Sequence, residues 1–191
     1  MNRREALERT GLILGYAVSA PVLMGILKGC KASPELTYKP DFFSNDQAGI
    51  MSEVAEIIIP KTDTPGAKDV GVPGFIDKML KECYKKEDQD RFMTGLASFD
   101  EEAKKSLGDS FMDLEPARQQ EHVKKVHDEA IAAYKKGDLK ERPFILMMKE
   151  LTLLGFFTSE PGATQVLQYD PVPGAYHGCV PLAEVGKTWA T

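Results

Sequence analysis

PFILMMKELTLLGFF, residues 143–157, is the most apolar of the candidate helices in this chain of 191 residues. Its only charged residues are Lys149 and Glu150. A helix of this composition carries apolar side chains on nearly every side, and such helices are usually buried. Either the core of the same chain or another protein can bury it. The segment therefore predicts a buried helix and leaves open what surrounds it.

Amphipathic patterns predict four further helices ahead of this one. They cover about residues 45–59, a stretch starting at residue 73, residues 87–107 and residues 115–134. Ser44 and Gln47 have the spacing of a capping box at the start of the first. Helical spacing places these side chains on the inward faces: Ile50, Met51, Val54, Ile57, Ile58, Phe75, Ile76, Met79, Leu80, Cys83, Phe92, Leu96, Phe99, Ala103, Leu107, Val123, Val126, Ala130, Ile131 and Tyr134.

Two stretches of the sequence follow no helical or strand period. Residues 60–75 hold three prolines and three glycines and are expected to form a structured loop. Residues 155–182, GFFTSEPGATQVLQYDPVPGAYHGCVPL, hold four prolines and four glycines. The predicted fold is all-α: a small bundle of about five helices with a long irregular C-terminal segment rich in Pro, Gly and aromatic residues.

The N-terminus has the composition of an export signal. Arg3 and Arg4 precede an uncharged apolar stretch over residues 11–27. That stretch is shorter than the ~20 apolar residues a spanning helix needs, although an uncleaved anchor helix remains an alternative. The adjacent arginines favour the twin-arginine route. We interpret residues 1–29 as a twin-arginine-type export signal.

Cys30 ends the sequence LKGC, which is similar to a lipoprotein box except for Lys28. We therefore expect residues 30–43 to be a lipidated N-terminus and tether, and residues 44–191 to be the helical domain with its C-terminal segment. The protein is then expected on the periplasmic side of a bacterial membrane, held there by a lipid anchor. The net charge of −5 argues against a nucleic-acid partner.

Catalytic and cofactor motifs are scarce. The sequence has no GxGxxG, no P-loop, no CxxCH and no CxxC. His122 and His127 lie roughly 140° apart on a helix, so they do not form an i, i+4 metal pair and are expected at the surface and half-buried. The enzyme alternative rests on Glu160, His177 and Cys179 in the C-terminal segment.

The cysteines leave their pairing open. Cys83 falls at an apolar helical position, where a buried thiol is usual, whereas Cys179 lies in the irregular C-terminal segment. An oxidising compartment permits a disulfide. Cys83 and Cys179 pair with each other, or one of them pairs with another chain.

Two stretches resemble the gluconate 2-dehydrogenase subunit 3 family. Residues 57–77 read IIIPKTDTPGAKDVGVPGFID, and residues 156–182 read FFTSEPGATQVLQYDPVPGAYHGCVPL. Val70 stands where the family usually has alanine. Both motifs are long and specific, and with the twin-arginine start the likeness extends over nearly the whole chain.

The resemblance implies a non-catalytic small subunit of a membrane-associated dehydrogenase. In such complexes a large GMC-type subunit carries FAD and oxidises a sugar or sugar acid, and a cytochrome c subunit often accepts the electrons. The small subunit is expected to support export, folding and membrane attachment of the large one. No cofactor is expected in this chain.

The resemblance gives the C-terminal segment an expected role, which is docking onto the catalytic subunit. Proline and glycine fix an irregular shape, and aromatic side chains supply contact area. The residues expected to dock are Phe156, Phe157, Glu160, Tyr169, Tyr176 and Cys179. Two alternatives stay open: the segment packs on its own bundle with Cys179 bonded to Cys83, or the chain is an independent envelope lipoprotein.

Overall fold

The computed structural model describes residues 36–137, 141–172, 174–175 and 178–190. Over these residues the chain is helical and contains no strand, which confirms the predicted all-α class. The elements are α2 (Asn45–Ile58), α3 (Val72–Cys83), α4 (Lys86–Leu107), the short 3₁₀ turn η1 (Phe111–Asp113), α5 (Pro116–Lys136), α6 (Phe144–Phe157), the π-helical turn η2 (Gly162–Val166) and α7 (Leu182–Val185). The predicted signal and lipidation residues, Arg3, Arg4 and Cys30, lie outside the described part.

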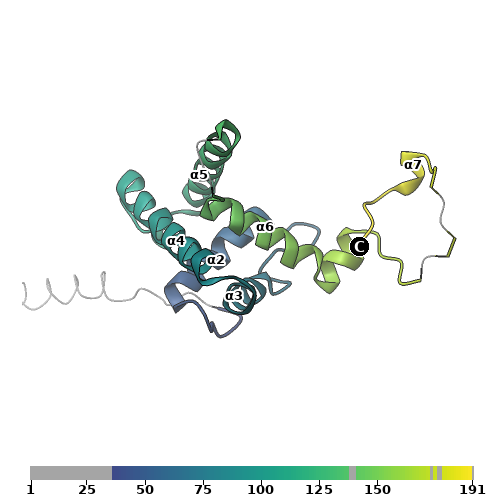
Figure 1. Cartoon of the computed structure of the whole chain (residues 1–191), viewed down its shortest axis with the longest axis horizontal. Helices are drawn as coiled ribbons and strands as arrows, with labels where there is room; N and C mark the ends of the chain where they lie inside the picture. The colour runs from purple at the N-terminus through teal and green to yellow at the C-terminus, as the bar shows by residue number, and fades with distance from the viewer. Residues whose placement is uncertain (1–35, 138–140, 173, 176–177, 191) are drawn as a thin grey trace, which may run out of the picture. The chain divides into compact units, whose positions relative to one another are not determined.

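Helix α6 is the centre of the bundle. It contacts α2, α3, α4 and α5, and Figure 1 shows it running across the other long helices. Met148 and Leu151 are essentially inaccessible to solvent. The one polar side chain buried with them, Thr152, donates its hydroxyl proton to the carbonyl of Met148 at 2.8 Å. The apolar segment at residues 143–157 is thus buried mainly by its own chain.

An aromatic cluster joins α4 and α6. The rings of Phe92 and Phe144 meet edge to face, with centroids 4.9 Å apart. Phe99 continues the cluster and lies 4.5 Å, ring to ring, from His122 of α5. Gly95 allows the approach, since a Cβ there would collide with the Phe144 side chain. Ring pairs of this geometry stabilise a core beyond the area that they bury.

The helix boundaries follow local signals. Ser44 and Gln47 form both hydrogen bonds of the predicted capping box. Gly108 and Gly137 end α4 and α5 in the left-handed region, with φ of 91° and 76°. Glycine adopts that conformation without steric cost.

Residues 36–43, which the sequence assigns to a tether, pack against the bundle. Phe43 is buried, and Leu36, Tyr38 and Phe42 lie against the core. Asp77 of α3, only 2% exposed, accepts the backbone N–H groups of Asp41, Phe42 and Phe43 at 3.0–3.2 Å. These residues therefore belong to the folded domain, and we name residues 36–43 the N-terminal strap.

Tyr38 lies in the same region as Asp77. Its hydroxyl is buried and has no hydrogen-bond partner among the described residues. Burial, together with the nearby Asp77 carboxylate, raises the pKa of Tyr38 above its ordinary range. The hydroxyl therefore stays protonated at any physiological pH.

Three burial predictions are wrong. Cys83 is exposed, because α3 ends there and Tyr84 packs against the core instead. Tyr134 is 49% exposed near the end of α5, where only the first half of the helix has buried residues. His122 is fully buried rather than at the surface or half-buried, and its Nε2 lies 3.1 Å from the carbonyl of Phe99.

Candidate interaction surfaces

The loop between α2 and α3, residues 59–71, is folded back on α2 by two carboxylates. Glu56 accepts the backbone N–H groups of Lys61 and Lys68 at 3.1 and 2.9 Å. Glu53 forms an ion pair with the Lys68 ammonium. Gly66 leaves room for the Glu56 carboxylate, which a Cβ at this position would displace. The loop is structured, as predicted, and its shape is set by α2.

The side chain of Asp69 stabilises the turn within this loop. Its carboxylate accepts the N–H of Gly66 at 3.1 Å and pairs with Lys61 at 3.1 Å. The Gly66 N–H and the Lys61 ammonium lower the pKa of Asp69. Sequence reasoning considered Asp63 for a turn and missed Asp69. The signal available was an Asp three residues after the glycine of the turn.

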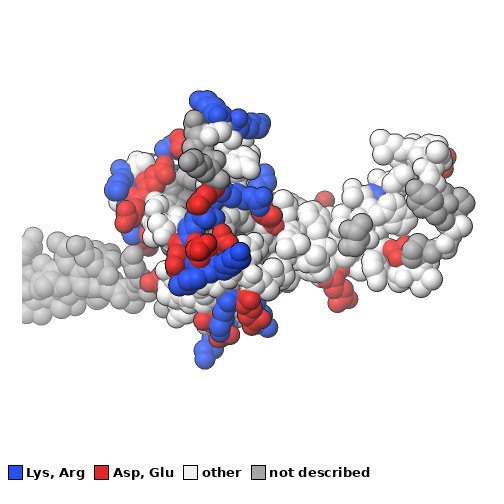
Figure 2. All heavy atoms as spheres, viewed as in Figure 1, with Lys and Arg blue, Asp and Glu red and all other residues white. Residues whose placement is uncertain are grey.

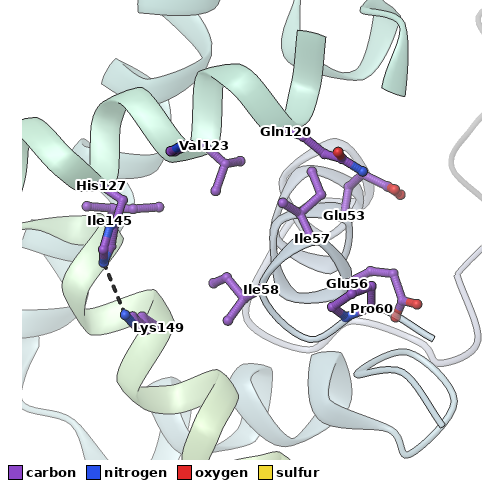
Figure 3. Close-up of a pocket in the computed structure, with 11 residues that line it drawn as sticks. Glu53, Glu56, Ile57, Ile58, Pro60, Gln120, Val123, His127, Ile145 and Lys149 are labelled. Atoms are coloured by element: carbon purple, nitrogen blue, oxygen red, sulfur yellow. Dashed lines mark hydrogen bonds between the residues drawn. The ribbon is translucent and has the colours of Figure 1, made fainter. Parts of the chain in front are cut away.

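A groove of about 510 Å³ lies between α2, α5 and α6, next to this loop. Figure 3 shows its apolar side chains, among them Ile57, Ile58 and Val123, facing the space between the helices. The lining residues are Glu53, Glu56, Ile57, Ile58, Pro60, Gln120, Val123, Lys124, His127, Ile145 and Lys149. Its volume lies in the range of ligand and peptide sites.

The polar rim of the groove includes a histidine–lysine contact. The Lys149 ammonium donates to His127 Nε2 at 3.2 Å, drawn as the dashed line in Figure 3. The other ring nitrogen, Nδ1, lies 3.3 Å from the Asp128 carboxylate. His127 therefore lies between the Lys149 ammonium and the Asp128 carboxylate and can orient Lys149. This contact was not foreseen from the sequence.

The C-terminal end of α6 carries exposed apolar side chains. Leu153, Leu154 and Phe157 are 36%, 44% and 36% exposed. Phe156, predicted to dock, is 2% exposed, which is a correction: its ring lies in the core of this chain. Gly155 faces α3 and lies close to the ring of Phe75. The helix thus changes from core to surface along its last two turns.

In the structure the C-terminal segment begins after α6, at residue 158, and its described residues expose many apolar side chains. They include Tyr169, Val172, Val180, Leu182 and Trp189. Figure 2 shows few charged atoms on the visible face of this segment, whereas the bundle carries many of both signs. Among the predicted docking residues, Phe157, Glu160, Tyr169 and Cys179 are exposed. Tyr176 and His177 lie outside the described residues.

Backbone pairing closes the C-terminal segment on itself. Gln168 and Trp189 form a parallel bridge, in which the Gln168 N–H donates to the Thr188 carbonyl at 2.8 Å. The Ala190 N–H returns a bond to the Gln168 carbonyl at 2.9 Å, and Lys187 donates to the Gln165 carbonyl. The two ends of the segment are therefore held together by main-chain atoms.

The described residues show neither a disulfide nor a cluster of metal ligands. Cys83 and Cys179 are both free, exposed thiols, and their pairing stays a prediction. The described residues contain no group of three His, Cys, Asp or Glu side chains arranged to hold a metal ion. Over the same residues, none of the helices combines the length and the apolar character needed to cross a membrane.

These features define a small all-α protein whose exposed apolar residues are concentrated at the end of a core helix and in a closed C-terminal segment. A family model described as gluconate 2-dehydrogenase subunit 3 matches residues 45–174, more than half of the chain. The chain belongs to this family, as the resemblance indicates. The match covers all the long helices, α2 to α6, and ends within the C-terminal segment. Neither the curated proteins nor the solved structures give a significant match.

Proposed function

We propose that this chain is a non-catalytic accessory subunit of an exported, FAD-dependent dehydrogenase complex. In the complex a separate GMC-type subunit oxidises a sugar or sugar acid. The observation that carries the proposal is the apolar surface of the α6 end and the C-terminal segment, on a chain whose family is described as a dehydrogenase subunit. Large exposed apolar patches on a soluble chain usually mark a contact with another protein.

The contact surface consists of Leu154 and Phe157 on α6 together with Tyr169, Leu182 and Trp189 of the C-terminal segment. Aromatic side chains dominate binding energies at interfaces because they bury much area with few rotatable bonds. The catalytic subunit covers these side chains in the complex. Cys179, as an exposed thiol, is available to bond a cysteine of that subunit.

The N-terminal sequence gives this chain a second role, the delivery of the catalytic subunit to the membrane. Arg3 and Arg4 direct export by the twin-arginine route, which carries folded proteins, and a catalytic subunit without its own signal travels with this chain. Lipidation of Cys30 then holds the complex on the periplasmic side of the membrane. A cytochrome c subunit is a further partner that receives the electrons.

Co-expression with a candidate FAD-dependent GMC-type oxidoreductase from the same organism tests the contact. Affinity purification of the tagged full chain is expected to bring down a chain with flavin absorbance that reduces a dye when sugar or sugar acid is added. Leu154→Asp combined with Leu182→Asp is expected to abolish the co-purification. Thr164→Asp, at an exposed polar position of the same segment, serves as the matched control. A catalytic subunit that is equally exported, stable and active without this chain would refute the proposal.

Fractionation tests delivery separately. Arg3→Lys combined with Arg4→Lys is expected to leave both subunits in the cytoplasm, and Cys30→Ser to release both from the membrane into the periplasm. An independent envelope lipoprotein would lose its own location in these variants while the dehydrogenase kept its own. Turnover by the lone chain that disappears in Cys179→Ala would instead support the enzyme alternative of Glu160, His177 and Cys179.

A further inference from the structure

The groove between α2, α5 and α6 is lined by two glutamates and two lysines, which differ in their partners. Glu53 is paired with Lys68, and Glu56 accepts two backbone N–H groups of the loop, so both carboxylates are satisfied within the chain. Lys124 and Lys149 line the same groove, and among the described residues neither is paired with a carboxylate. The groove therefore offers two ammonium groups without a carboxylate partner among the described residues, on a chain that is acidic as a whole.

The floor beneath these ammonium groups is apolar. Ile57 and Ile58 come from α2, Val123 from α5 and Ile145 from α6. Val123 and Ile145 are buried at the base, while the two α2 residues are half-buried. A ligand that satisfies both features needs an apolar side chain to cover the floor and a carboxylate within reach of the lysines.

The groove is continuous with the apolar surface of α6. Lys149, Leu153 and Phe157 follow one another at i, i+4 spacing, which places them as neighbours along one side of the helix. Leu153 and Phe157 are exposed. A protein that covers the end of α6 is therefore positioned to extend along the helix into the groove.

We infer that the groove binds a segment of the catalytic subunit that presents an apolar side chain beside carboxylates. Aspartate or glutamate of this segment pairs with Lys124 and Lys149, and the apolar side chain covers Ile57 and Ile58. His127 acts as a positioning residue, since its Nε2 holds the Lys149 ammonium at the rim. This inference rests on the proposed function, and it gives the complex a second contact separate from the C-terminal segment.

The test measures the affinity of the full chain for the purified FAD-containing subunit. Lys124→Glu combined with Lys149→Glu is expected to weaken binding by about 3- to 30-fold, the loss of two exposed ion pairs. Lys78→Glu combined with Lys105→Glu makes the same change of net charge on α3 and α4, which do not line the groove, and is expected to leave the affinity within twofold. Raising the salt concentration is expected to weaken the wild-type complex more than the groove variant.

The outcomes separate this inference from the proposed function. If the wild-type chain does not bind the FAD-containing subunit, the proposed function fails. If it binds and the groove variant binds equally well, with the same salt dependence, the groove is not part of the contact and only the inference is overturned. Circular dichroism checks the folding of each variant. Lys124→Gln with Lys149→Gln repeats the measurement, with a smaller loss expected, should the reversed charges prevent folding.

Discussion

Replacing Asp77 by asparagine should detach the N-terminal strap from the bundle. The Asp77 carboxylate accepts three backbone N–H groups, from Asp41, Phe42 and Phe43, at a site that is 2% exposed. Hydrogen bonds to a charged group contribute about 1.5–3 kcal/mol each, against about 0.5–1.5 kcal/mol for neutral ones. Asparagine keeps the shape of the side chain but loses the charge, and it turns an NH₂ group toward donors. The weaker hydrogen bonds destabilise the fold, and the lower cost of burying a neutral amide offsets part of this effect. We therefore expect a net loss of about 2–4 kcal/mol in the free energy of unfolding.

Urea unfolding of the full chain, followed by far-ultraviolet circular dichroism, measures this loss. With a urea dependence of about 2 kcal/mol per molar, the Asp77→Asn midpoint should fall by about 1–2 M. Glu82→Gln, at an exposed position of the same helix, removes the same charge and should leave the midpoint unchanged. Hydrogen exchange at residues 41–43 should accelerate only in Asp77→Asn. Equal midpoints for the two variants would refute the role assigned to the buried carboxylate.

Three further predictions address the core, the acid stability and the C-terminal segment. Gly155→Ala should destabilise the fold by about 1–3 kcal/mol, because the new Cβ would lie 2.6 Å from the Phe75 ring; Gly174→Ala, which meets no atom within 4 Å, should be neutral in the same urea assay. Burial raises the pKa of Asp100, but the hydrogen bonds that its carboxylate accepts outweigh burial, and the net pKa is lowered. The ionised carboxylate therefore stabilises the fold above the pKa that Asp100 has in the unfolded chain. This stability is lost as the pH falls through the lower pKa of the folded state. Asp100→Asn should therefore be less stable than wild type at neutral pH and approach it below about pH 4. Ala190→Pro removes a donor of the closing bridge and should accelerate amide exchange at the other end of the C-terminal segment, whereas Ala190→Val should not.

Local signals in the sequence predict the helices well. The capping box of Ser44 and Gln47, the glycines after α4 and α5 and the apolar content of residues 143–157 act within one or two helical turns, and each sets a boundary or a burial that the structure contains. The stripe of α4 is also correct, since Phe92 and Phe99 face the core as their spacing predicts.

Contacts between distant residues account for most of what the sequence does not predict. The carbonyl that lies within hydrogen-bond distance of His122 Nε2 belongs to Phe99, 23 residues away. The backbone N–H groups that donate to Asp77 lie 34–36 residues away. No periodicity in the sequence encodes such partners. A polar residue on an apolar face is buried when a partner elsewhere satisfies it, and the partner becomes visible only when the helices are packed.

The two explanations offered for the apolar helix at residues 143–157 apply to different parts of it. From Phe144 to Leu151 its apolar side chains lie mostly in the core of the chain, whereas Leu154 and Phe157 remain exposed. A partner that covers the exposed end would bind the folded chain and not the unfolded one. Binding would then raise the free energy of unfolding, and the increase would grow with the logarithm of the partner's concentration. Since α6 contacts every other long helix, stabilising its end stabilises the whole bundle. The same helix can therefore connect the folding of this chain to the binding of a partner.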